Sequence, residues 1–281
     1  MPEPGDDSLR LSEVWHLGLA LPRVGEDGGP VMGRGAGSST EFQDHRNYTP
    51  GDDVRKLDWR AYARTDQLML KRFREEVRPQ VELIVDASLS MDSEPGKAQR
   101  AVDLAAMLAR SIQRMGWRVR VWRVGEQVLP LPVPALLAQG LSPDARRPLM
   151  DSLRHLAPRV GVGSMVVLIS DFLSPLDPAA LVALLGQRAG ALGLLQVLGE
   201  WESDPPVGGS VEMVDSELGE RMQVTLEPGV VARYRERLER LSEALDQECR
   251  RAGGAFSAVV ASQGLEQSCL QLGERGWLVT G

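Results

Sequence analysis

Short apolar segments alternate with amphipathic segments along most of this chain, and this alternation restricts the possible folds more than any other feature. The apolar segments are typical of buried strands and are Val81–Val85, Met165–Phe172, Leu192–Gly199 and Gly254–Ser262. The amphipathic segments have apolar residues three and four apart, as in helices, and are Lys97–Met115, Pro143–Leu156, Ala179–Ala189, Pro228–Ala252 and Leu265–Leu272. Strands that alternate with helices predict an α/β fold, with a mostly parallel sheet and helices on both faces.

Two further segments alternate polar and apolar residues and predict hairpins. In the segment "WRVRVWRVGEQVLPL", Trp117 and the valines that follow share one face, and Gly125 with Glu126 forms the turn. We expect this hairpin to lie half-exposed at an edge of the sheet. A smaller hairpin is expected from Ser210 to Leu226, around the sequence "SELGE".

Charge and cysteine content exclude several classes of protein. The 281 residues carry a net charge of −7, which argues against general binding to nucleic acid or to an anionic membrane. Cys249 and Cys269 are far apart and form no Cys-x-x-Cys pair, which fits a reducing compartment. The sequence begins without a signal-peptide pattern, and no apolar run approaches the roughly 20 residues of a membrane helix. We therefore expect a cytoplasmic protein without a membrane span.

The residues before the first apolar strand predict an N-terminal extension. We place the extension at residues 1–77 and the α/β domain at residues 78–281. A helix is expected over Ser8–Ala20, and Gly25–Thr40 is rich in glycine and serine. The glycine spacing in Gly25–Thr40 is similar to that of a phosphate-binding loop. However, no strand precedes it and no Gly-Lys-Ser/Thr follows it, so we interpret it as a linker.

Acidic and hydroxyl side chains follow two of the apolar strands directly. Asp86, Ser88 and Ser90 come after the first strand, and Asp171 comes after the second. Ligand sites of open α/β sheets gather at the carboxyl ends of the strands, so all four side chains are expected at one edge if the strands are neighbours. An oxygen-only set suits a hard cation such as Mg²⁺ or Mn²⁺. The alternative is a strand-end turn capped by Asp and Ser.

The pattern Asp-x-Ser-x-Ser at residues 86–90 resembles the metal-ion-dependent adhesion site of von Willebrand factor A domains, and "SDF" around Asp171 resembles their second acidic loop. Together with "EFQDHRNYTPGDDVRKLDWRAYARTDQLMLKRFREE" upstream, "VELIVDASLSM" is similar to the signature of the bacterial domain-of-unknown-function 58 family. The resemblance implies a von Willebrand factor A-like fold. It also implies a non-catalytic adaptor that acts with a MoxR-type AAA+ ATPase in the assembly or activation of client proteins.

The resemblance also implies a metal ligand that this chain lacks. Adhesion sites take a Thr from a loop between the two acidic loops, and no Thr stands between Met91 and Ser170. We therefore expect Mg²⁺ or Mn²⁺ to bind weakly, near millimolar, which corresponds to about −4 kcal/mol.

The upstream stretch carries a dense mixture of charged and aromatic residues. They are Arg46, Tyr48, Gly51, Asp52, Asp53, Arg55, Asp58 and Trp59. We interpret them as a charge-paired clasp that ties the extension to the α/β domain, with Trp59 buried between the two. The alternative is a surface that faces a partner.

An enzymatic function is the second hypothesis, with Asp86 as a phosphoryl-accepting nucleophile and Asp171 as a Mg²⁺ ligand. Phosphatases of the haloacid-dehalogenase type need an acid two residues after the nucleophile, where this chain has Ser88. The histidines His16, His45 and His155 are scattered, and no Gly-x-Ser-x-Gly motif occurs. We therefore expect no enzymatic activity. A third hypothesis is a metal-free structural scaffold.

Overall fold

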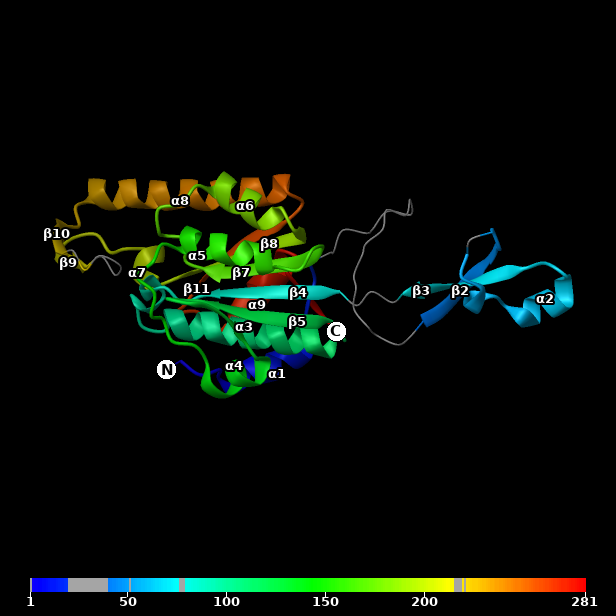
Figure 1. The fold of residues 1–281 in the computed structure, drawn as a ribbon. Coiled ribbons are helices and arrows are strands. Elements are labelled where there is room, and N and C mark those ends of the chain that lie inside the picture. Colours follow the sequence, from blue (N-terminus) through cyan, green and yellow to red (C-terminus); the bar gives the residue numbers. More distant parts are fainter. Residues whose placement is uncertain (1, 20–39, 51, 76–78, 215–218, 220) are drawn as a thin grey trace. The chain divides into compact units, whose positions relative to one another are not determined.

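The computed structural model describes residues 2–19, 40–50, 52–75, 79–214, 219 and 221–281 (Figure 1). By their contacts the residues form two compact units. The larger unit consists of Met1–Glu26 and Pro79–Gly281, and the smaller unit is Asp27–Arg78. The boundary expected near residue 78 coincides with the end of the smaller unit, whereas residues 1–26 group with the α/β unit instead of the extension. No helix among the described residues is long and apolar enough to cross a membrane.

A six-stranded sheet forms the centre of the larger unit, in the order β11-β8-β7-β4-β5-β6. All neighbouring strands are parallel except β5 and β6, which form the expected antiparallel hairpin at one edge. The strands are β4 (Gln80–Asp86), β5 (Arg118–Val124), β6 (Val128–Leu131), β7 (Ser164–Ser170), β8 (Ala189–Leu198) and β11 (Ala255–Val260). The predicted α/β class with a mostly parallel sheet is confirmed.

Helices cover both faces of this sheet, as the sequence predicts (Figure 1). Alternate residues of β4 enter separate cores, with Val81, Leu83 and Val85 in one and Ile84 in the other. The first core also takes residues of α1 (Asp6–Val14), α3 (Lys97–Arg114), α4 (Val133–Gln139) and α9 (Leu265–Glu274). The second takes residues of α5 (Leu149–Leu156), α6 (Pro178–Gly186) and α8 (Pro228–Arg251).

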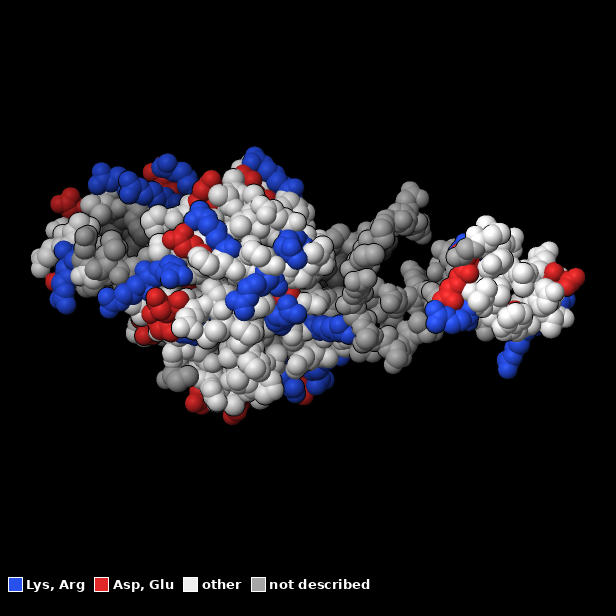
Figure 2. Space-filling model, viewed as in Figure 1, with Lys and Arg blue, Asp and Glu red and all other residues white. Residues whose placement is uncertain are grey.

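The outer face of α8 is charged, and its arginines lie beside acidic residues (Figure 2). Arg240 pairs with Glu236 at 2.6 Å, and Arg250 pairs with Asp246 at 3.0 Å, each one helical turn away. Such pairs add only a few tenths of a kcal/mol each. The long helix therefore depends on its buried stripe, which includes Leu245.

Two local predictions need correction, and one helix was missed. The helix expected over Ser8–Ala20 ends at Val14, because β1 (Trp15–Leu17) pairs antiparallel with β12 (Leu278–Thr280). The helix expected from Pro143 begins at Leu149 as α5, directly after Pro148, since a proline disfavours helical conformation in the residue before it. Helix α4 was not predicted, because the prolines of "LPLPVPALLAQG" mask its short apolar pattern.

Two short elements follow the carboxyl end of β8. Helix α7 (Glu200–Ser203) comes first, and the hairpin of β9 (Ser210–Val214) and β10 (Arg221–Thr225) comes next. The hairpin confirms the sequence prediction. Both elements follow the carboxyl end of a parallel strand, which is the edge where the acidic loops lie.

The smaller unit is a hairpin with helical turns between its strands. Strand β2 (Thr40–Asn47) pairs antiparallel with β3 (Met69–Glu75), and η1 (Val54–Lys56) and α2 (Trp59–Thr65) lie between them. Asp58 caps α2 by accepting hydrogen bonds from the backbone N–H groups of Arg60 and Ala61, at 3.0 and 3.2 Å. Its second oxygen lies 2.8 Å from His45 Nε2 on β2. The helix is thereby tied to the strand.

The charged motif pairs within the smaller unit itself. Arg46 meets Asp52 at 2.6 Å and Arg55 meets Asp53 at 3.0 Å, as expected of the "PGDD" acids. The Tyr48 backbone N–H donates to the Leu68 carbonyl at 2.9 Å. Trp59, in contrast, is 64% exposed, and its ring meets the edge of the Tyr62 ring at 6.3 Å between centroids. The smaller unit does not itself bury Trp59.

Gly51, which belongs to the same predicted motif, lies outside the described residues. So does almost all of the predicted Gly25–Thr40 linker, of which only Thr40 is described, as the first residue of β2.

Candidate functional site

The two acids singled out in the sequence come to the same edge of the sheet. Asp86 is the last residue of β4 and Asp171 follows the last residue of β7. These strands are parallel neighbours, with Val85 opposite Ile169. Both carboxyl groups are almost fully buried. The prediction that they share one edge is confirmed.

Both oxygens of the Asp86 carboxyl group accept hydrogen bonds. Oδ1 accepts from the Ser88 backbone N–H at 2.8 Å, and Oδ2 accepts from the Ser170 hydroxyl at 2.6 Å. Burial, and then the negative charge of Asp171, raise the pKa of Asp86 to about 6, although these hydrogen bonds oppose the shift. None of the described groups that shift this pKa is a cation.

Ser88 and Ser90 turn their hydroxyls toward each other, and the two oxygens share a hydrogen bond of 2.9 Å. Their loop is fastened to a second loop, because the Leu89 N–H donates to the Ala145 carbonyl at 2.9 Å and the Asp144 N–H donates to the Ala87 carbonyl at 2.8 Å. Ser88 and Ala145 form an isolated parallel bridge. The second loop continues into Arg146 and Arg147, both exposed.

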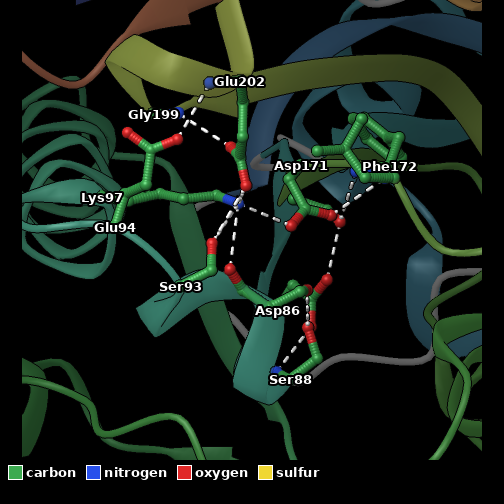
Figure 3. A network of polar contacts seen from close by, with 12 residues as sticks. Asp86, Ser88, Ser93, Glu94, Lys97, Asp171, Phe172, Gly199 and Glu202 are labelled. Carbon is green, nitrogen blue, oxygen red and sulfur yellow. Dashed lines mark hydrogen bonds and ion pairs between the residues drawn. The ribbon is translucent and has the colours of Figure 1, made fainter. Parts of the chain in front are cut away.

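A buried lysine lies at the centre of the site (Figure 3). Lys97 is the first residue of α3 and has no exposed surface. Its Nζ lies 2.8 Å from Asp171 Oδ2, 2.6 Å from Glu202 Oε1, 2.9 Å from the Ser90 carbonyl oxygen and 3.3 Å from Ser93 Oγ. A buried ammonium is stable only when it is paired and hydrogen-bonded, and both conditions hold here.

Two glutamates connect the lysine to the carboxyl end of β8. Glu202 Oε1 accepts a hydrogen bond from Ser93 Oγ at 2.9 Å, and Oε2 accepts from the Gly199 N–H at 2.8 Å. Glu94 accepts from the N–H groups of Trp201 and Glu202, at 3.0 and 2.9 Å. The start of α3 and the short helix α7 are thus joined by side chains about 100 residues apart in the chain.

Further polar groups, from β8 and α8, form hydrogen bonds to this network. Gln196 donates to the Asp171 carbonyl at 2.8 Å and accepts from Ser242 of α8 at 3.0 Å. The Tyr234 hydroxyl donates to the Glu202 carbonyl at 2.7 Å. Burial, followed by the charge of Glu202, raises the pKa of Tyr234 to about 12, so it stays a hydrogen-bond donor. Helix α8 therefore helps to position the site.

Sequence reasoning missed Lys97, Ser93, Ser170 and Glu202. A lysine at the first turn of a helix usually faces solvent, and the positive end of the helix dipole disfavours a cation there. One signal was available in the composition. Of the 32 basic residues only Lys56, Lys71 and Lys97 are lysines, so a lysine beside the acidic loops departs from the chain's strong preference for arginine.

The four predicted metal ligands differ in the contacts that they already make. Ser88 and Ser90 fit, because adjacent ligands of an octahedral Mg²⁺ with bonds of about 2.1 Å lie about 3 Å apart. Asp171 already has partners, because its Oδ2 lies 2.8 Å from Lys97 Nζ and its Oδ1 accepts from the Leu173 N–H at 3.0 Å. One carboxyl group of raised pKa and two hydroxyls remain, a set with little charge to hold a divalent cation. Among the described residues no cluster of three His, Cys, Asp or Glu could hold a metal either.

No histidine or cysteine among the described residues takes part in the hydrogen bonds of this network. His155 Nδ1 is 2.7 Å from the Asp151 carbonyl oxygen within α5, His45 belongs to the smaller unit and His16 lies in β1. Burial raises the pKa of both Cys249 and Cys269 to about 12, so neither is a ready thiolate.

Comparison with known proteins agrees with the resemblance noted in the sequence. A family model described as "Protein of unknown function DUF58" matches residues 44–245. The chain belongs to this family. An uncharacterized protein of Mycobacterium tuberculosis (strain ATCC 25618 / H37Rv) is 28% identical over 222 residues, which cover 72% of this chain and 68% of that protein. An uncharacterized protein of Mycobacterium bovis matches this DUF58 chain to the same extent.

Two solved structures resemble part of this DUF58 protein. One is the conserved hypothetical protein BatB from Bacteroides thetaiotaomicron, with 12% identity and a TM-score of 0.39 over 70% of this chain and 98% of that chain. The other is an aerotolerance-related membrane protein from Bacteroides fragilis, with 14% identity and a TM-score of 0.40 over the same shares.

Proposed function

We propose that this DUF58 protein is a non-catalytic interaction module with a von Willebrand factor A-like domain, whose carboxyl sheet edge receives a partner protein. The observation that carries the proposal is the paired loops at this edge. The Ser88–Ser90 hydroxyls lie beside a loop that presents Arg146 and Arg147, exposed and without an ion pair or hydrogen bond among the described residues. A preassembled polar rim of this kind suits recognition of a protein surface.

The charge of the rim indicates the chemistry of the partner. Guanidinium groups bind carboxylates through two parallel hydrogen bonds, so two exposed arginines favour a partner with Asp or Glu side chains. Trp201, 52% exposed at the start of α7, adds an aromatic contact beside the polar network. Aromatic and arginine side chains carry most of the binding energy in many interfaces. The partner segment expected here is acidic, with an apolar residue close by.

The family resemblance suggests who provides this segment. A MoxR-type AAA+ ATPase is the partner that we expect, in the assembly or activation of client proteins. This partner is expected by analogy with the family.

Asp86 is poorly suited to the alternative role of a phosphoryl acceptor. Its two oxygens already accept hydrogen bonds, and its raised pKa lowers the ionised fraction. The structure does add a lysine near the site, which the sequence did not reveal, but Lys97 donates to Asp171 and Glu202. Asp86 would have to exchange both partners before it could attack a phosphate. Magnesium-dependent hydrolysis of p-nitrophenyl phosphate that Asp86→Asn abolishes would favour the enzyme instead.

Binding between the purified protein and the MoxR-type ATPase of the same genome tests the proposal. Arg146→Glu with Arg147→Glu reverses the charge of the rim and should weaken binding at least tenfold, since like charges then face each other. Arg110→Glu with Arg118→Glu is the matched control. It makes the same charge change at exposed positions near the opposite end of the sheet, and it should bind as the unchanged protein does. Equal loss in both variants would contradict a localised site.

A further inference from the structure

We infer that the Lys97 ammonium is the resident cation of this site, and that it assembles the acidic loops in the place where an adhesion site uses a divalent metal. The inference concerns how the edge is held together, and it holds whichever partner binds there. It explains why two acidic loops can meet in a chain that lacks the expected Thr.

The first step is the set of atoms around the ammonium. Lys97 Nζ has four oxygen neighbours between 2.6 and 3.3 Å: two carboxylate oxygens, one backbone carbonyl and one hydroxyl (Figure 3). They come from three segments of the chain, around Ser90, Asp171 and Glu202. Hard cations such as Ca²⁺ and Mn²⁺ take the same kinds of oxygen. The cage therefore has the composition of a cation site, with an ammonium at its centre.

The second step is the electrostatic balance. The Lys97 side chain has no exposed surface, and those of Asp171 and Glu202 have little. Buried carboxylates need a counter-charge, and Lys97 is the base that contacts both. Its single charge balances two, so the network stays anionic. A lysine suits this cage better than an arginine, because the four acceptors surround one nitrogen atom, whereas the five donors of a guanidinium are spread over a plane.

The third step concerns the carboxylate ligand that this arrangement makes unavailable to a metal ion. Asp171 is turned to Lys97, so the four ligands predicted from the sequence cannot gather around one ion while the lysine is in place. The unchanged protein should then keep its structure in the presence of a chelator. Removal of the ammonium should leave an oxygen cage with two uncompensated carboxylates, which a divalent cation can fill.

Two substitutions of Lys97 distinguish the effect of its charge from the effect of the volume of its side chain. Lys97→Ala removes the ammonium and opens room in the cage, so Mn²⁺ should bind at least tenfold more tightly than to the unchanged protein. Added Mn²⁺ should also raise the melting temperature of this variant. Lys97→Met removes the charge but fills the space, so Mn²⁺ should not restore its stability. The double variant Lys97→Ala, Asp171→Asn should lose the gained affinity.

Manganese titrations followed by electron paramagnetic resonance and by thermal unfolding test these expectations. Mn²⁺ binding to the unchanged protein as tight as that to Lys97→Ala would overturn the inference, and so would a Lys97→Ala protein that binds no more Mn²⁺ than the unchanged one.

A measurement on the unchanged protein keeps the inference testable if the variants fail to fold. Acetylation of lysine amines, followed by mass spectrometry, should modify Lys97 at least a hundredfold more slowly in the native protein than in urea. EDTA added beforehand should not change that protection. Protection that EDTA removes would show that a metal holds the loops, and rapid native modification would show that the cage is open. Neither result depends on partner binding, so failure of this inference can be told apart from failure of the proposed function.

Discussion

The two units both concentrate paired charges, but they place them very differently. In the larger unit Lys97 meets Asp171 and Glu202 with no exposed surface on the lysine, whereas in the smaller unit Arg55 and Asp53 pair with 86% and 39% of their side chains exposed. Ion pairs in water contribute little, while a buried charge that loses its partner is strongly destabilising. The buried ion pairs at the sheet edge therefore hold the structure together. The exposed ion pair of the smaller unit contributes little to stability, so its charged groups can serve to bind a partner.

Loss of the buried charge should give the largest effect. Lys97→Met leaves Asp171 and Glu202 without their cation, and we expect the free energy of unfolding to fall by about 3–5 kcal/mol. Urea unfolding followed by circular dichroism measures it. A loss under about 1 kcal/mol would mean that the two acids take up protons or water at little cost, and the contrast between the units would disappear.

The pH dependence of the free energy of unfolding should report on Asp86, the carboxyl group that Lys97 does not contact. An Asp of the unfolded chain has a pKa of about 3.9, whereas burial and the charge of Asp171 raise the pKa of Asp86 to about 6 in the folded protein. The folded state binds this proton more tightly, so its stabilising contribution is present below about pH 4 and is lost as the pH rises through 6.

Comparison with an Asn variant isolates this contribution. Between pH 4 and 7 the stability of the unchanged protein should fall relative to Asp86→Asn by about 2–3 kcal/mol. Asp92→Asn, at an exposed position of the same loop region, is the control and should show no such difference. A difference that rises with pH would mean that Asp86 has a cation beside it after all.

Substitution of Trp59 should have a smaller effect on the free energy of unfolding, and it tests whether this side chain is buried. A tryptophan buried between two domains would cost about 3–5 kcal/mol on truncation to Ala. Since Trp59 is 64% exposed, we expect Trp59→Ala to cost less than about 1 kcal/mol in urea unfolding, within the range of surface substitutions. Tyr62→Ala, at the ring that Trp59 touches, is the matched variant. A loss of several kcal/mol would indicate that Trp59 is buried against the α/β domain, as the predicted clasp requires.

The smallest effect is expected from the exposed ion pair. Arg55→Ala should change the free energy of unfolding by no more than about 0.5 kcal/mol, and added salt should reduce even that difference. Thermal unfolding at low and high salt checks this. A salt-insensitive loss above about 1 kcal/mol would show that this pair is structural, like the buried one.

The sequence predicted the parts of the site that follow from strand position. Asp86 and Asp171 were found because each ends an apolar run, and the parallel pairing of β4 with β7 then fixes their common edge. Lys97 and Glu202 could not be found in this way, because the contact between them joins residues 105 apart in the chain. The start of α5 was misplaced because the periodicity continues across Pro148 although the helix does not. Neither a long-range contact nor the effect of a proline on a helix can be inferred from the local sequence pattern alone.

The order of the chain has a mechanical consequence. The smaller unit lies between residues 26 and 79, so it is joined to the larger unit by two connections, one after β1 and one directly before β4. Strand β1 is fastened to β12, and β4 is hydrogen-bonded on both sides, to β5 and to β7. A force on the smaller unit would therefore enter the larger unit at β1 and at the first residue of β4. The central strand that carries Asp86 at its far end is therefore the element that any such tension would reach first from that connection.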